Sequence, residues 1–137
     1  MKREIKFRAW DKVHECYLYD VQGAYDTLSG HVKYGDGENA CYDEDCFGNF
    51  LDNDRYVVEQ FTGIHDKNGR EIYEGDVLDI GLRNQDGKPV IAPVSYATYA
   101  AGYVLDNGGN GIWQRLTEDC EVIGNIFEDK QLLDKKQ

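Results

Sequence analysis

The sequence predicts a mainly β fold with a small barrel or roll in its C-terminal half, and three observations support this. Short runs of β-branched and aromatic residues recur between residues 56 and 127, at intervals of about 8 to 20 residues. Turn sequences rich in Gly, Asn and Asp separate these runs. The 137 residues show no long amphipathic helix pattern.

The N-terminal region, residues 1–55, is predicted to be rich in β-structure. Residues 4–10 alternate strictly, with Ile5, Phe7 and Ala9 on one side, which indicates a half-buried strand. A turn after Trp10 and a run at 16–21 complete a hairpin, and residues 31–34 form a further short strand. Residues 36–54 contain seven acidic residues and no Lys, Arg or His, so they are expected to form a long solvated loop.

The second region, residues 56–137, is expected to begin with a strand at 56–63. Asn68-Gly69 follows it and predicts a hairpin with a type I′ turn, because that turn needs positive φ at both central positions. A bend at Gly75 then leads into a strand at 77–80, and a second turn is expected at 84–87.

The rest of the second region contains shorter strands. Pro89 and Pro93 are expected to place the entry to the next strand at a sheet edge or in a loop, because proline donates no ladder hydrogen bond. Gly102 allows a bend between residues 95 and 105. Strands at 112–116 and 121–127 and a helical turn in the tail, 128–137, complete the expected elements.

The composition indicates an acidic cytoplasmic protein. A formal net charge of -11 repels DNA, RNA and anionic membranes at long range. Neither a membrane span nor a secretory signal is evident, so the cytoplasm is the expected location. In that reducing compartment the four cysteines are expected to be free thiols, although three pairings are formally open: Cys16, Cys41, Cys46 and Cys120.

Three segments carry a resemblance to a known family. They are residues 4–12 (EIKFRAWDK), 60–78 (QFTGIHDKNGREIYEGDVL) and 121–128 (EVIGNIFE). In this order and spacing they resemble the YopX family of phage and prophage proteins. The resemblance implies an SH3-like barrel in the C-terminal half, a phage origin and a tendency to form homo-oligomers. It supplies no activity and no catalytic residues.

Candidate chemical sites in the sequence are incomplete. Cys41 and Cys46 are separated by four residues, and no second Cys or His pair stands at a matching spacing for zinc. A calcium loop laid over Asp43 to Asp54 places Phe47 at the fifth position, where a ligand is needed. Weak divalent binding by the acidic loop stays open. The sequence therefore predicts no catalytic, cofactor-binding or metal-binding residues and no cofactor.

Three functional hypotheses follow. The first is a self-associating, non-enzymatic protein-binding module with a host or phage protein partner, in which an aromatic group forms barrel core or a subunit interface: Tyr96, Tyr99, Tyr103 and Trp113. The second is a nucleic-acid-associated accessory factor that uses the basic residues of the first strand: Lys2, Arg3, Lys6 and Arg8. The third is an unrecognised metal-dependent or hydrolytic enzyme.

Overall fold

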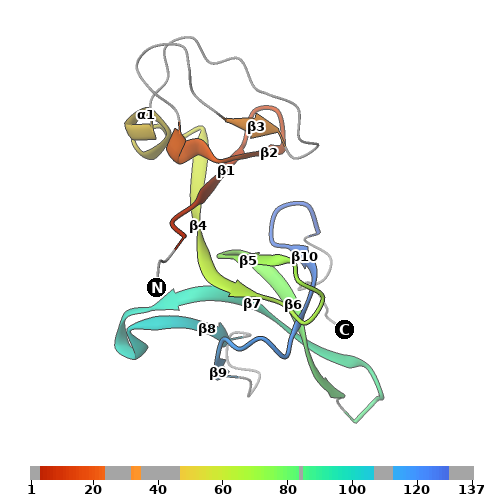
Figure 1. Cartoon of the computed structure of the whole chain (residues 1–137). Helices are drawn as coiled ribbons and strands as arrows, with labels where there is room; N and C mark the ends of the chain where they lie inside the picture. The colour runs from red at the N-terminus through yellow and green to blue at the C-terminus, as the bar shows by residue number, and fades with distance from the viewer. Residues whose placement is uncertain (1–3, 24–31, 35–46, 84, 107–112, 130–137) are drawn as a thin grey trace. The chain divides into compact units, whose positions relative to one another are not determined.

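The computed structural model describes residues 4–23, 32–34, 47–83, 85–106 and 113–129. It confirms a mainly β protein with curled, barrel-like antiparallel sheets (Figure 1). The chain forms two compact units, Met1–Phe61 and Thr62–Gln137. None of the helices in the described ranges is long and apolar enough to cross a membrane.

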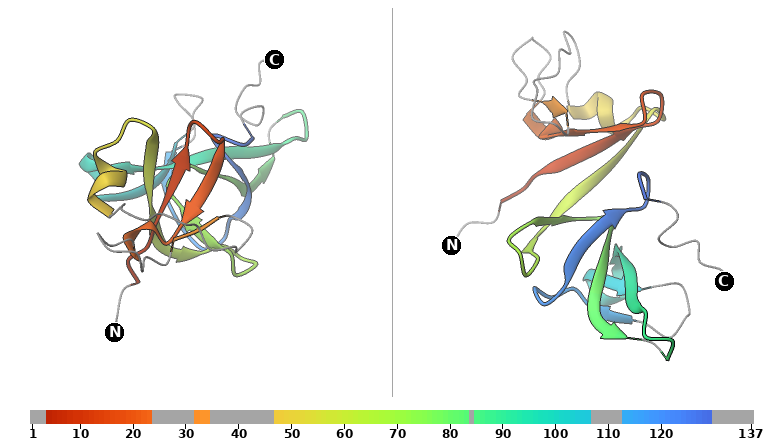
Figure 2. Two further views of the ribbon diagram at one scale, coloured as in Figure 1. Left: turned by 90° about the horizontal axis from the view of Figure 1, so that it is seen from above. Right: turned by 90° about the vertical axis from the view of Figure 1, so that its right-hand side faces the viewer.

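The first unit is a small antiparallel sheet with the strand order β3-β2-β1-β4. Its elements are β1 (Phe7–Asp11), β2 (Cys16–Tyr19), η1 (Val21–Gly23), β3 (Lys33–Tyr34), α1 (Phe47–Leu51) and β4 (Tyr56–His65). The expected hairpin is formed by β1 and β2, and the strand expected at 31–34 appears as β3. β1 lies between β2 and β4 and is therefore a central strand of this sheet (Figure 2).

One face of this sheet carries the apolar core of the first unit. Phe7 and Ala9 lie on that face as the alternation predicts, whereas Ile5 precedes the strand and is exposed. The loop expected at 36–54 is wrong in part, because residues 47–51 form α1. Phe47 and Phe50 are three residues apart, so one helical turn directs both rings into the core. Phe50 is fully buried against Tyr56, with ring centroids 4.7 Å apart.

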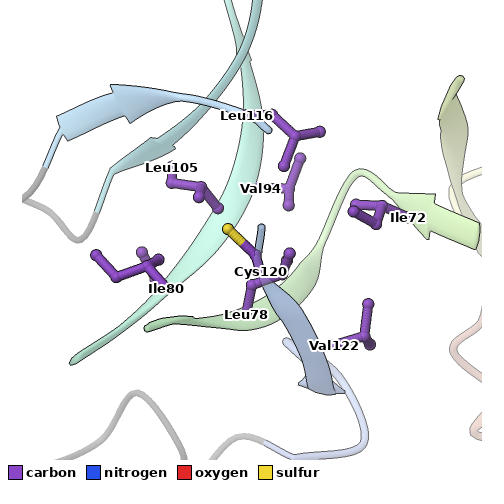
Figure 3. Packing of buried hydrophobic residues seen from close by; sticks show 9 residues of the cluster. Ile72, Leu78, Ile80, Val94, Leu105, Leu116, Cys120 and Val122 are labelled. Carbon is purple, nitrogen blue, oxygen red and sulfur yellow. The ribbon is translucent and has the colours of Figure 1, made fainter. Parts of the chain in front are cut away.

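The second unit contains a five-stranded antiparallel sheet with the order β10-β6-β7-β8-β9. Its elements are β5 (Glu71–Tyr73), β6 (Asp76–Arg83), β7 (Pro89–Ala97), η2 (Thr98–Ala100), β8 (Gly102–Asp106), β9 (Trp113–Arg115) and β10 (Glu121–Asn125). The end of β4 pairs with β5, which extends the first sheet to the order β3-β2-β1-β4-β5. Figure 3 shows the side chains that converge on one core: Ile72, Leu78, Ile80, Val94, Leu105, Leu116, Cys120 and Val122. Ala92 of β7 belongs to the same cluster.

The turn at Asn68-Gly69 forms the expected hairpin but is not of type I′. Gly69 has a φ of 85°, whereas Asn68 is not among the residues with positive φ. The N–H of Gly69 donates to the carbonyl oxygen of Asp66 over 2.9 Å. The Asp66 side chain also accepts the N–H groups of Asn68 and Arg70, each over 2.9 Å. The turn therefore uses positive φ at Gly69 only, and the hydrogen bonds that the Asp66 side chain accepts stabilise the chain reversal.

β7 corrects two expectations about its prolines and its bend. The entry at residues 89–93 is a strand paired with β6 and not a loop, and the pairing with β8 covers only the later residues 94–97. The pairing with β8 ends at Val94, so the missing N–H of Pro93 falls just beyond that ladder. The chain reverses through η2 and Ala101, whose φ is 51°, and not through a bend at Gly102.

The last strands agree with the sequence pattern. The runs at 112–116 and 121–127 appear as β9 and β10. The β10 ladder shifts register between Val122 and Gly124. Of the tail, residues 130–137 lie outside the described residues, and so does the predicted helical turn for the most part.

Candidate interaction surface

The hairpin formed by β7, η2 and β8 carries no charged residue before Asp106, the last residue of β8. Residues 89–105 contain no Asp, Glu, Lys, Arg or His, although 30% of the chain is charged. Beneath the tip of the hairpin is a small cluster of buried side chains: Ala97, Ala100 and Val104. The small alanine side chains allow the tight turn to pack closely against β8. Apart from Asp106 at the end of β8, the hairpin is therefore a packed and uncharged feature of an acidic protein.

Two tyrosines of this hairpin form a cross-strand pair. Tyr96 of β7 lies directly opposite Tyr103 of β8, and their ring centroids are 5.4 Å apart at an interplanar angle of 81°. This edge-to-face geometry is the favourable one for aromatic rings. Tyr103 is half-buried and packs against the core of the second unit, whereas Tyr96 is 51% exposed. The pair therefore extends from the apolar core, where Tyr103 packs, to the exposed ring of Tyr96.

Tyr99 lies at the tip of the hairpin and is 76% exposed. The backbone that holds it is well defined by local interactions. Ala101 has left-handed dihedral angles, φ 51° and ψ 42°, and its N–H donates to the carbonyl oxygen of Thr98 over 3.1 Å. Arg115 of β9 donates from Nη1 to the carbonyl oxygen of Ala100 over 3.0 Å. A large aromatic ring is therefore presented to solvent on a braced turn.

The structure separates the predicted aromatic group. Tyr96 and Tyr99 are exposed, so the interpretation of these two as barrel core is wrong, while a role in a subunit interface stays a prediction. Trp113 lies in β9, but its side chain is outside the described part of the structure. Sequence reasoning missed Arg115 and Ala101, because their roles depend on strand register and carry no local signal.

The two described basic residues of the N-terminal segment, Lys6 and Arg8, do not form an exposed basic pair. Arg8 is buried, and its Nε donates to Oε1 of Glu59 over 2.8 Å. Lys6 lies 3.7 Å from the Glu4 carboxylate and over the ring of Phe61. Lys2 and Arg3 lie outside the described residues. The hypothesis of nucleic-acid binding therefore loses Arg8 as a contact residue.

Asp11 forms a second polar cluster in the first unit, at the β1–β2 turn. Its buried carboxylate accepts two hydrogen bonds from Arg55, at Oδ1 and Oδ2, each over 2.9 Å. The His14 ring nitrogen Nδ1 lies 2.9 Å from Oδ2. Burial alone would raise the pKa of the Asp11 carboxyl, but the bonds from Arg55 and His14 outweigh it and hold that pKa well below its usual range. Because the carboxylate also accepts the N–H of Val13, it acts as a brace for the turn.

Asp66 is a buried carboxylate that stabilises a turn of the second unit, as Asp11 does in the first. Its Oδ2 accepts the N–H of Val122 over 2.9 Å, in addition to the turn amides at Oδ1. Burial would raise the pKa of this carboxyl, but hydrogen bonds from Val122, Arg70 and Asn68 lower it below the ordinary value. The N–H of Lys67 also donates to the carbonyl oxygen of Cys120. The turn of the β4–β5 hairpin is therefore tied to the start of β10.

The cysteines and acids within the described ranges do not assemble a metal site. No group of three or more His, Cys, Asp and Glu side chains there is close enough to hold an ion. Cys16 is half-buried, whereas Cys120 is a buried free thiol whose pKa is raised by burial. Cys41, Cys46 and most of the candidate calcium loop lie outside the described residues.

These features define an acidic, mainly β protein that presents a braced, uncharged aromatic hairpin. The chain belongs to the YopX protein family, whose model matches residues 6–134. It is similar to the solved structure titled "Crystal structure of protein EF1440 from Enterococcus faecalis". The TM-score is 0.57 and the identity 27%, covering 97% of this chain and 100% of that chain. A comparison with curated proteins found no match.

Proposed function

We propose that this chain is a phage-encoded, non-enzymatic protein-binding module of the bacterial cytoplasm that associates with copies of itself through the β7–β8 hairpin. The observation that carries the proposal is the exposure of two neighbouring tyrosines, Tyr96 and Tyr99, on this braced hairpin. The phage origin is supported by membership of the YopX family.

The chemistry of the hairpin favours a protein partner. Tyrosine gives a large apolar contact area and a polar tip, and it is enriched among the residues that dominate binding energy. Because Ala101 and Arg115 hold the turn, Tyr99 loses little conformational freedom on binding. A nucleic acid stacked on these rings would need several nearby cations. Residues 89–112 contain no Lys or Arg, and the guanidinium of Arg115 already donates to the carbonyl oxygen of Ala100.

The charge distribution favours a second copy as the partner. Two chains of net charge -11 repel each other over most of their surfaces. The uncharged hairpin is where such copies approach at the lowest electrostatic cost, since residues 89–105 carry no charge. Tyrosine rings also complement one another, as the pair of Tyr96 and Tyr103 shows within the chain.

Sedimentation velocity over a range of protein concentrations tests this proposal. We expect wild-type protein to form a concentration-dependent oligomer and the double variant Tyr96→Ser/Tyr99→Ser to sediment as a monomer. Tyr34→Ser is the matched control, because Tyr34 is a 40% exposed tyrosine on β3 of the first unit. A wild-type protein that is monomeric throughout, or an oligomer that the double variant leaves intact, would disprove the proposed role of the hairpin.

A further inference from the structure

The backbone of β7 changes neighbours along its length. Its first half pairs with β6, and that register ends at Val77 opposite Pro93. Its second half pairs with β8, from Val94 opposite Leu105 to Ala97 opposite Gly102. Among the described residues, 95–97 therefore have a strand partner only on the β8 side.

Two hydrogen bonds establish which way the peptide groups of this segment point. The carbonyl oxygen of Val94 accepts the N–H of Gly75 over 3.0 Å, on the side of β7 that faces β6. The carbonyl oxygen of Tyr103 accepts the N–H of Leu116 over 3.1 Å, which directs the Tyr103 groups away from β7. In an antiparallel sheet, the N–H and C=O of one residue point to the same side and alternate along the strand.

Tyr96 must then direct its own N–H and C=O away from β8. It is two residues after Val94, and it stands opposite Tyr103, whose carbonyl oxygen accepts a hydrogen bond on the other side of β8. The side chain of Tyr96 is half-exposed, and the adjacent Ser95 and Thr98 are exposed as well. A short open strand edge therefore accompanies the exposed tyrosines.

We propose that two copies of this chain associate by antiparallel strand addition at Tyr96. This inference rests on the proposed function and specifies its geometry. The N–H of Tyr96 donates to the C=O of Tyr96 in the second copy, and the reverse bond completes the pair. Antiparallel pairing of identical strands generates a two-fold axis, which is the commonest symmetry of soluble oligomers. The two Tyr96 side chains then lie opposite each other on one face.

The register of this contact is restricted on both sides. The Val94 carbonyl oxygen is already used by Gly75, and the chain turns away from the strand at η2. Tyr96 is therefore the residue at which a symmetric pair can form. Since one such pair gives only two hydrogen bonds, the rings of Tyr96 and Tyr99 must supply most of the contact area.

Two variants separate the backbone contribution from that of the ring. Tyr96→Ala removes the ring and keeps the N–H, whereas Tyr96→Pro removes both. We expect Tyr96→Pro to raise the dissociation constant of the dimer about tenfold or more above that of Tyr96→Ala, because both intersubunit bonds are lost. The thermal unfolding midpoints of the two variants should be similar, because the open edge donates no bond within the chain. Equal dissociation constants would contradict strand addition.

Amide exchange of the wild-type protein, followed residue by residue by NMR, tests the same geometry without substitution. We expect exchange at the Tyr96 amide to slow as the protein concentration rises through the dissociation constant. A dimer in which the Tyr96 amide exchanges as fast as in the monomer would overturn strand addition and leave the proposed function intact. A protein that stays monomeric in sedimentation would overturn both.

Discussion

The two units of this protein differ in what they bury. The main core of the second unit is a set of apolar side chains and one thiol. In the first unit, one face of the sheet is equally apolar, but the other face buries Arg8 and Glu59 beside Trp10 and Tyr17. Apolar burial stabilises a fold without specifying partners, whereas a buried ion pair demands one geometry. We call Arg8, Glu59 and Tyr17 the ionic row, and we infer that it specifies the strand register of the first unit.

The geometry of the ionic row supports this inference. Arg8 of β1 lies directly opposite Glu59 of β4 on one side and Tyr19 of β2 on the other. Oε1 of Glu59 also accepts the hydroxyl of Tyr17 over 2.9 Å, and the Arg8 guanidinium lies 4.1 Å from the centre of the Tyr17 ring. A slip of one residue would place Arg8 on the apolar face and would separate every member of the row.

The largest expected effect comes from breaking this row on one side. Glu59→Leu leaves the Arg8 charge buried without its carboxylate, so we expect the free energy of unfolding to fall by about 3–5 kcal/mol. The double variant Arg8→Met/Glu59→Leu should regain most of that loss, because neither charge is then buried alone. Denaturation with urea, followed by tryptophan fluorescence and circular dichroism, measures both changes.

An exposed ion pair of the second unit is the matched control for the ionic row. Lys67 and Glu121 are 3.9 Å apart and both are substantially exposed. Glu121→Gln should change stability by less than about 1 kcal/mol. If Glu59→Leu were as mild as this control, the contrast between the two units would fail.

The sequence predicted the fold better than the environment of individual side chains. Alternation in residues 4–10 correctly separates the Ala9 face from the Arg8 face, since period two follows from strand geometry alone. Alternation says nothing about what covers each face, so the burial of Arg8 could not be predicted. The spacing of Phe47 and Phe50 was a helical signal within a segment whose acidic composition suggested a loop.

The candidate surface was predictable only in part. The tyrosines and the absence of cations are visible in the sequence, and they mark residues 96–103 as unusual. The exposure of Tyr99 depends on the left-handed conformation of Ala101, which alanine rarely adopts and which no sequence pattern indicates. The direction of the Tyr96 peptide groups depends on pairing between distant strands. Such properties arise from register and therefore require a structure.

Lowering the pH should have an effect of intermediate size on stability, and one buried carboxylate in each unit contributes to it. The pKa values of Asp11 and Asp66 are both lowered by folding, so each carboxylate stabilises the protein above its unfolded pKa of about 4. That stabilisation is lost as the pH falls from about 5 through the lower folded values. We expect the free energy of unfolding to decrease steadily over this range, measured with urea at fixed pH values.

Asn substitutions assign the acid sensitivity to each unit. Asp66→Asn directs an amide donor at backbone N–H groups. We expect the free energy of unfolding to fall by about 1–3 kcal/mol near pH 7 and to decrease less steeply below about pH 5 than in the wild type. Asp11→Asn should behave similarly, but with a salt dependence, because Asp11 is held by the charged and partly exposed Arg55. If stability decreased with falling pH as steeply in both variants as in the wild type, other carboxylates would be responsible for the acid sensitivity.

The smallest expected effect on stability concerns residues with positive φ, of which each unit contains one that can be replaced by glycine. Glu15 in the first unit and Ala101 in the second both have positive φ, 54° and 51°, which costs an L-residue about 1–2 kcal/mol. Glycine removes this cost and adds an entropic one of about 0.5–1 kcal/mol, so Glu15→Gly and Ala101→Gly should each stabilise by about 0.5 kcal/mol. Ala100→Gly is the control, because Ala100 is a buried member of η2 that is not left-handed, and we expect it to destabilise. If thermal unfolding showed Ala101→Gly to be destabilising like its neighbour, the turn that presents Tyr99 would not be strained. Its rigidity would then rest on the hydrogen bonds that Arg115 and the Ala101 N–H donate.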